Sequence, residues 1–174
     1  MSYPSTVIGS GFDQRVLDAV RSDLAAAVLE FDDARAWFDA AVRGPMEPLG
    51  AEVWVFDPAR TRVVLVRHPW RAWVPPGGRV EPGETPREGA ARELFEETGV
   101  RAELLDRPAA VAVRSFHPSL PVTLSFSYVA VAAASTPLVG EDGQQAAWKQ
   151  LDHGWESSFP EDHARMRRLV TAWP

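Results

Sequence analysis

Three glutamates stand on one face of a predicted helix, and their spacing points to metal chemistry. Glu93, Glu96 and Glu97 are three and four residues apart, so a helix places them within one turn of each other. Like charges this close destabilise a helix, and Glu97 would lie at the C-terminal end, where the helix dipole disfavours an anion. Hard divalent cations bind several carboxylate oxygens from one side, and water completes the shell. The spacing therefore indicates a site for Mg²⁺ or Mn²⁺, with a solvated acidic surface helix as the alternative.

Capping residues mark both ends of this helix. Thr85 can cap the first turn, Pro86 suits the first helical position, and Glu88 completes a capping box. Gly99 tolerates the left-handed conformation that ends a helix. The sequence therefore predicts about three turns over residues 86–97.

The loop before the helix adds a fourth carboxylate. Gly77-Gly78 and Pro82-Gly83 allow the chain to fold back, so Glu84 can approach the same helix face. Arg92 lies four residues before Glu96, and it can brace one glutamate without neutralising all of them. The loop and the helix together predict one compact acidic site.

The remaining elements predict an α/β layered domain with a mixed sheet. Residues 12–43 show a helical pattern of apolar positions, which a proline- and glycine-rich connector ends. A second amphipathic helix is predicted at the C-terminus, with Met166, Leu169, Val170 and Trp173 on one face. Strands are predicted at 51–57, 62–68, 100–105, 109–116, 122–134 and 146–152. We expect a helical N-terminal extension over residues 1–48 and the main domain over residues 49–174.

Composition excludes several classes of function. The 174 residues suit one domain, and the absence of cysteine excludes disulfides, thiolate catalysis and cysteine zinc sites. The formal net charge of −6 argues against non-specific nucleic-acid binding, although a bound cation can bridge the chain to a small phosphorylated substrate. The N-terminus shows no signal-peptide pattern, and no apolar stretch approaches the ~18 residues that span a membrane. We therefore expect a cytoplasmic protein that does not enter the membrane.

The segment from Gly78 to Val100 resembles the Nudix box of the Nudix hydrolases at every defining position. These positions are Gly78, Glu84, Arg92, Glu93, Leu94, Glu96, Glu97, Gly99 and Val100. The resemblance implies an α/β/α sandwich with a mixed central sheet over about residues 50–155. It does not cover the N-terminal helices, which we expect as an addition to that fold.

The resemblance also implies roles for the acidic residues. Glu84, Glu93, Glu96 and Glu97 would hold Mg²⁺ or Mn²⁺, and Arg92 would orient a glutamate. Glu93 and Glu97 would act in catalysis, with Glu93 as the first candidate for the general base. Glu141, in the loop "VGEDGQQAAW", is the downstream candidate for that base, and Asp142 is next to it. A solvated turn is the alternative interpretation of this loop.

Substrate recognition rests on residue types near the box. An arginine can bind phosphate, and an aromatic ring can stack on a base. The candidates are Arg67, Arg71, Trp73, Gly78 and Phe116, with Trp70 and His117 as further options. For the side chains among them, core packing or surface exposure is the alternative. The residues after the box match no substrate-specific marker of the family, so the substrate stays open.

The resemblance implies hydrolysis of a diphosphate bond in a nucleoside diphosphate derivative, a small molecule. A non-catalytic domain that binds a nucleotide or another ligand is the alternative function. A third option is an enzyme that acts on RNA ends, but the acidic charge balance argues against a nucleic-acid partner. Homodimers are common in the family, and the N-terminal helices offer a surface for one.

Overall fold

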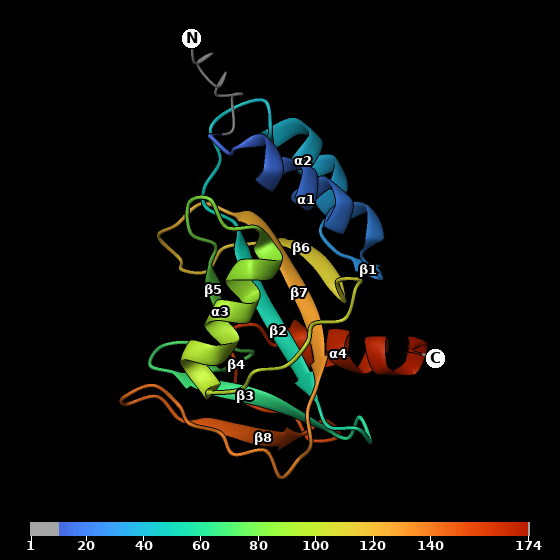
Figure 1. Ribbon diagram of the computed structural model, residues 1–174, viewed down its shortest axis with the longest axis vertical. Coiled ribbons are helices and arrows are strands. Elements are labelled where there is room, and N and C mark those ends of the chain that lie inside the picture. Colours follow the sequence, from blue (N-terminus) through green and yellow to red (C-terminus); the bar gives the residue numbers. More distant parts are fainter. Residues whose placement is uncertain (1–10, 174) are drawn as a thin grey trace.

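The computed structural model describes residues 11–173, which form a layered structure of helices around one sheet (Figure 1). The helices are α1 (Gln14–Ala26), α2 (Ala34–Ala41), α3 (Pro86–Thr98) and α4 (Glu161–Ala172). The strands are β1 (Leu29–Glu30), β2 (Gly50–Phe56), β3 (Arg62–His68), β4 (Ala72–Val74), β5 (Gly77–Arg79), β6 (Ala110–Arg114), β7 (Thr123–Val131) and β8 (Ala146–Gln150). No helix within residues 11–173 is both long enough and apolar enough to cross a membrane.

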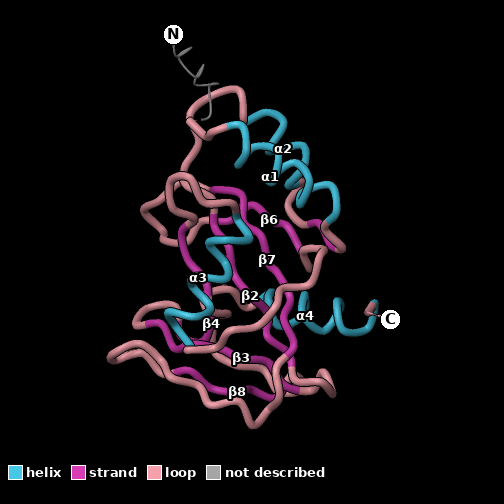
Figure 2. Tube along the Cα trace, in the orientation of Figure 1, coloured by secondary structure: helices cyan, strands magenta, loops and turns pink. Residues whose placement is uncertain are grey.

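The sheet is mixed, as predicted. Its strands follow the order β1-β6-β7-β2-β3-β4, while β5 pairs with β2 and β8 pairs with β3. The pairs β1–β6 and β2–β7 are parallel, and the others are antiparallel. β2 and β3 share one register pair, Phe56 with Val63, and then take different partners. Figure 2 shows the result, with β3 and β8 at the end of the molecule opposite α1 and α2.

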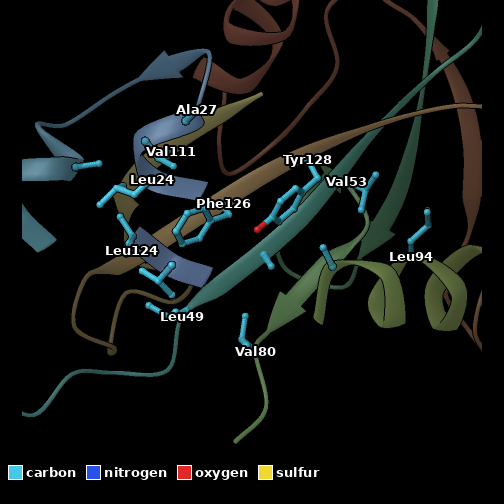
Figure 3. Packing of buried hydrophobic residues seen from close by; sticks show 14 of the residues in the cluster. Leu24, Ala27, Leu49, Val53, Val80, Leu94, Val111, Leu124, Phe126 and Tyr128 are labelled. Atoms are coloured by element: carbon cyan, nitrogen blue, oxygen red, sulfur yellow. The ribbon is translucent and has the colours of Figure 1, made fainter. Parts of the chain in front are cut away.

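Successive residues of a strand point to opposite faces of the sheet, so the strands contribute to two hydrophobic cores, one on each face. On β2, Val53 and Val55 face the core shared with α1, α2 and α3, whereas Trp54 and Phe56 face the core shared with α4. Figure 3 shows Leu24 of α1 and Leu94 of α3 in the first of these cores, with Phe126 and Tyr128 between them. This arrangement confirms the predicted α/β/α sandwich.

The N-terminal region is less continuous than its sequence pattern predicted. Instead of one helical stretch over 12–43, a short strand at Leu29–Glu30 pairs in parallel with β6 and separates α1 from α2. Val16, Leu17, Val20 and Leu24 of α1 are buried in the same core as α3. The boundary between residues 48 and 49 stays a prediction, and residues 1–10 of the extension lie outside the described residues.

Two further segments differ from the predicted elements. Residues 100–105 form a loop and not a strand: Val100 is buried and Leu104 packs on the core. The Leu105 N–H donates to the carbonyl of Val129 on β7 at 2.8 Å, but the segment forms no ladder with a described strand. Residues 69–78, "PWRAWVPPGG", are rich in proline and glycine and so predict a loop, but they contain β4 and the start of β5. The other predicted strands and the C-terminal helix are present, with ends shifted by a few residues.

Candidate active site

Helix α3 carries most of the candidate catalytic carboxylates, and its ends follow from its sequence. The Thr85 hydroxyl accepts a hydrogen bond from the Glu88 backbone N–H at 3.2 Å, and the Glu88 carboxylate accepts one from the Thr85 N–H at 2.8 Å. Pro86 occupies the first turn, and Gly99 ends the helix with φ +71°. These contacts satisfy N–H groups that a helix start leaves unpaired. The predicted helix is therefore confirmed, and it extends one residue further, to Thr98.

Arg92 binds three glutamates, although its spacing suggested that it would brace only one. Its Nε donates to Glu84 at 2.8 Å, and its Nη1 donates to Glu93 at 2.8 Å and to Glu96 at 3.0 Å. Its Nη2 also donates to the backbone carbonyl of Arg79 on β5 at 3.0 Å. The hydrogen bond to Arg92 lowers the pKa of Glu84, and the bonds to Glu84 and Glu93 raise that of Arg92. One guanidinium thus joins the loop, β5 and the acidic face of α3.

Glu97 is the most buried of the four box glutamates, with 8% of its surface exposed. Its carboxylate accepts hydrogen bonds from the Gly77 backbone N–H at 2.8 Å and from the Gln144 side chain at 3.2 Å. Burial raises the pKa of Glu97 to about 7, and the negative charge of Glu93 adds to the effect. The role of Gln144 was not foreseen, because nothing local links it to α3.

The raised pKa of Glu97 predicts an unusual pH dependence of stability in the metal-free protein. A carboxyl whose pKa is near 7 in the folded state and about 4.5 when unfolded binds its proton more tightly in the folded state. Its stabilising contribution is therefore complete at low pH and is lost as the pH rises through 7. The free energy of unfolding of the parent should therefore fall between about pH 5 and pH 7. With a chelator present, we expect Glu97→Gln to lack the part of this fall that the release of about one proton causes. Thermal unfolding across that range measures the slope, and equal slopes for both proteins would contradict the prediction.

Gly78 allows Glu93 to pass close to β5. A Cβ atom at this position would lie 2.6 Å from Glu93 Oε1 and 2.7 Å from its carboxyl carbon. Burial raises the pKa of Glu93, although Arg92 opposes the shift, and the charges of Glu96 and Glu141 add to it. Glycine is therefore needed here for space, since any larger residue would displace the carboxylate.

We expect Gly78→Ala to lower kcat by about a hundredfold, because a displacement of about 1 Å at a reacting group has effects of this size. The matched control is Gly44→Ala, since among the described residues a Cβ at Gly44 meets no atom within 4 Å and Gly44 lines neither hollow of candidate substrate residues. Steady-state kinetics on both variants, with circular dichroism to verify folding, test the prediction. Wild-type kinetics for Gly78→Ala would show that the position of Glu93 is not critical.

The loop after β7 brings Glu141 near the same carboxylates. The Val139 N–H donates to the carbonyl of Thr98 at 2.9 Å, which fixes the loop against the end of α3. Glu141 is exposed, and its negative charge contributes to the raised pKa values of Glu93 and Glu97. The structure therefore gathers Glu141 with the box glutamates.

Carboxylates are the type of ligand that a hard divalent cation binds, but these side chains do not converge on one point in the structure. Within residues 11–173, no three acidic or histidine side chains converge closely enough to hold a metal ion. Arg92 holds Glu84, Glu93 and Glu96 around its guanidinium, and Glu97 faces Gly77. Burial disfavours the charged forms of Glu93 and Glu97, and a cation would offset this cost. The donor set is therefore compatible with Mg²⁺ or Mn²⁺.

The candidate substrate residues divide between two hollows. Arg71, Gly78 and Phe116 line a cavity of about 120 Å³ together with Gly50 and Arg79. The Arg71 Cζ lies 5.8 Å from the centre of the Phe116 ring, and within residues 11–173 its buried Nε has no hydrogen-bond partner. Burial lowers the pKa of Arg71, and the nearby Glu97 opposes this shift.

The other candidates lie elsewhere. Arg67 and Trp73 line a separate hollow of about 430 Å³ with Lys149, whose Nζ lies 3.8 Å from the centre of the Trp73 ring. Trp70 is 70% exposed, and the His117 ring contacts the hydroxyl of Ser119 at 2.6 Å. The first hollow is therefore the one that combines predicted substrate residues with the acidic site.

Comparisons with known proteins agree with the resemblance of residues 78–100 to the Nudix box. A model of the NUDIX domain matches residues 46–171. A Bacillus subtilis (strain 168) protein named "Putative 8-oxo-dGTP diphosphatase" is 44% identical over 55 residues, which cover 32% of this chain and 37% of that protein. An RNA pyrophosphohydrolase of Erythrobacter litoralis is 60% identical over 35 residues, or 20% of this chain and 21% of that protein. The matches thus span well under half of these relatives' length.

Solved structures show the fold over a longer range. A C. elegans Ap4A hydrolase in a binary complex superposes with a TM-score of 0.61 at 18% identity, covering 72% of this chain and 97% of that one. A MutT protein from Methanosarcina mazei Go1 gives a TM-score of 0.56 at 19% identity, with 72% and 94% coverage. The domain match extends over most of the chain and includes the acidic helix, so the chain belongs to the Nudix family.

Proposed function

We propose that this Nudix enzyme hydrolyses a diphosphate bond in a nucleoside diphosphate derivative with the help of Mg²⁺ or Mn²⁺. The observation that carries the proposal is that Arg92 holds Glu84, Glu93 and Glu96 around one guanidinium, with the Glu93 side chain only 17% exposed and Glu97 buried beside them. These four residues would hold the cation. When bound, the cation offsets charge on the phosphoryl oxygens and acidifies a water molecule.

A carboxylate then accepts the proton of the attacking water. Glu93 is the first candidate, because burial raises its pKa toward the range in which a base works near neutral pH. Glu141 is the second candidate, since it is exposed and close enough to influence Glu93 and Glu97. Arg92 orients Glu84 and Glu93 through the hydrogen bonds described above.

Arg71 and Phe116 are the proposed substrate contacts. A half-buried guanidinium whose Nε has no partner among residues 11–173 is a natural ligand for a phosphate oxygen, and Phe116 offers a ring for stacking beside it. The names of the relatives include 8-oxo-dGTP, Ap4A and RNA as substrates. Their shared chemistry is a nucleotide with a phosphoanhydride, and this is the substrate class that we propose here.

We expect Arg71→Leu to raise KM about tenfold with a smaller change in kcat, because a hydrogen bond to a charged phosphate contributes on this scale. Arg43→Leu is the control, since Arg43 is exposed and lies outside both hollows. Initial rates over a range of substrate concentrations separate KM from kcat. Equal KM values for the two variants would remove Arg71 from the binding site.

The proposed function is tested with a panel of nucleoside triphosphates, dinucleoside polyphosphates and nucleotide sugars. Products are identified by mass spectrometry, with Mg²⁺, with Mn²⁺ and with a chelator. We expect turnover of at least one compound that stops with the chelator and in the variants Glu96→Gln and Glu97→Gln. Equal turnover by these variants and the parent would refute the proposal, and tight nucleotide binding without turnover would favour a non-catalytic ligand-binding domain.

A further inference from the structure

Arg15, near the start of α1, reaches across to the loop and helix that carry the acidic site. Its Nη1 donates to Glu88 Oε1 at 2.9 Å, and its Nη2 donates to Glu88 Oε2 at 3.1 Å. Its Nη2 also donates to the carbonyl oxygen of Gly83. One side chain from outside the segment that matches the domain model therefore binds two points on either side of the helix cap.

A second polar contact fixes α1 against the same turn of α3. Asp23 accepts a hydrogen bond from the Tyr128 hydroxyl at 2.5 Å and lies 3.9 Å from the Nη2 of Arg87. Arg87 in turn donates to the carbonyl of Leu105 at 2.9 Å. Arg15 and Asp23 thus hold the adjacent residues Glu88 and Arg87 through opposite charges. Because apolar residues of α1 and α3 share one core, α1 is a rigid support for these contacts.

The contact at Gly83 bears directly on Glu84, the next residue. Gly83 has φ +84°, and the Glu84 N–H donates to the carbonyl of Glu81 at 3.0 Å within the same turn. The Glu84 carboxylate accepts from the Glu81 N–H at 3.0 Å and from Arg92. Arg15 therefore fixes the peptide group that determines where the Glu84 side chain begins.

We propose that Arg15 is a positioning residue for Glu84, so that a helix outside the Nudix box helps to build the cation site. The inference rests on the proposed function, because it assumes that Glu84 takes part in holding the cation. Arg15 and Glu88 are 58% and 52% exposed, and exposed ion pairs contribute little to stability. Removal of Arg15 should therefore leave the protein folded and the Glu84 turn less ordered.

The sign of the effect separates positioning from simple electrostatics. Loss of a positive charge near an acidic cluster would by itself strengthen the binding of a cation. Loss of a positioning contact weakens it, because the carboxylate must then be ordered when the ion binds. The two mechanisms thus predict opposite changes in Mn²⁺ affinity for Arg15→Ala.

The experiment is calorimetric titration of the full chain with Mn²⁺, without nucleotide, together with the melting temperature of each variant. We expect Arg15→Ala to weaken Mn²⁺ binding about fivefold, less than the loss typical for residues that contact metal ligands directly. Arg15→Lys should recover part of the affinity, because an ammonium can still bind the Gly83 carbonyl. Arg21→Ala is the matched control, since Arg21 is an exposed arginine of the same helix whose side chain makes no hydrogen bond or ion pair with another described residue.

Each of the following outcomes would overturn the inference. Unchanged or tighter Mn²⁺ binding by Arg15→Ala would show that the contact does not position Glu84. An equal loss in Arg21→Ala would show that any substitution on the exposed face of α1 weakens binding, because loss of positive charge alone would strengthen it. A lower melting temperature without a change in affinity would show a purely structural role. If the parent protein itself bound no Mn²⁺, the metal-dependent function would fail first, and the inference would fall with it.

Discussion

Glu93→Gln should lower kcat by about a thousandfold, the size of effect expected for a general base. Glu93 lies between Arg92, at 2.8 Å, and the backbone of Gly78, so a glutamine of the same shape can occupy its place. The substitution removes the negative charge and the proton acceptor without opening a cavity. The loss should therefore appear in kcat, with the melting temperature close to that of the parent.

The control is Glu103→Gln, which removes the same charge from an exposed residue in the loop after α3. It should leave kcat unchanged. A loss below about tenfold in Glu93→Gln would exclude Glu93 as the base, since such catalysts typically contribute more than this. In that case Glu141→Gln becomes the decisive variant, because Glu141 is the other carboxylate that the loop after β7 brings to the site.

Arg114→Ala should lower the free energy of unfolding by about 3–5 kcal/mol, the cost of leaving one partner of a buried ion pair without the other. Arg114 on β6 donates from Nη2 to Asp162 at 2.8 Å and from Nη1 at 3.1 Å. The two side chains are 6% and 1% exposed. Burial opposes the charge on Arg114, but Glu52 and Asp162 raise its pKa above the usual value. Truncation of Arg114 would leave Asp162 buried without its counter-charge.

The double variant Arg114→Met/Asp162→Leu provides the comparison, because apolar replacement of both partners is often neutral or stabilising. Urea unfolding of the parent, Arg114→Ala, Arg114→Met, Asp162→Leu and the double variant measures the coupling. We expect the double variant to be more stable than Arg114→Ala. A loss below about 1 kcal/mol in the single variant would show that water reaches the pair and compensates for its removal.

Local signals explain why the acidic helix could be predicted from the sequence. Thr85, Pro86 and Gly99 act within one turn of the helix ends, so their effect does not depend on the rest of the fold. Runs of apolar residues likewise predicted most of the strands, and apolar residues three and four positions apart predicted the apolar face of α4. Where a structure depends on neighbours in sequence, the pattern of residue types is sufficient.

Contacts between distant segments could not be predicted in this way. The apolar residues between Val100 and Leu104 indicated burial, but burial does not specify a strand partner. Just after this segment, the carbonyls of Leu105 and Asp106 accept hydrogen bonds from the Arg87 side chain. In a strand, a neighbouring strand would satisfy such carbonyls. β5 was missed because a glycine-rich segment of three residues has no strand signal until β2 pairs with it.

The same limit applies to the candidate site. The grouping of Glu84, Arg92, Glu93 and Glu96 follows from helical spacing and one turn, and the sequence predicted it. The contacts of Glu97 with Gln144 and of Glu88 with Arg15 join residues 47 and 73 positions apart. No spacing rule connects such residues. The roles of the site residues in metal and substrate binding stay predictions.

The most direct test of the central claim is a crystal structure of the protein with Mn²⁺ and a non-hydrolysable nucleotide, with data collected at the manganese absorption edge. The account predicts an anomalous peak bound by carboxylate oxygens of Glu93 and Glu97, with Glu84 and Glu96 in direct or water-mediated contact. The Arg92 guanidinium would have to release at least one of its three glutamates. A bound nucleotide without an anomalous peak among these carboxylates, or with the manganese elsewhere, would contradict the account.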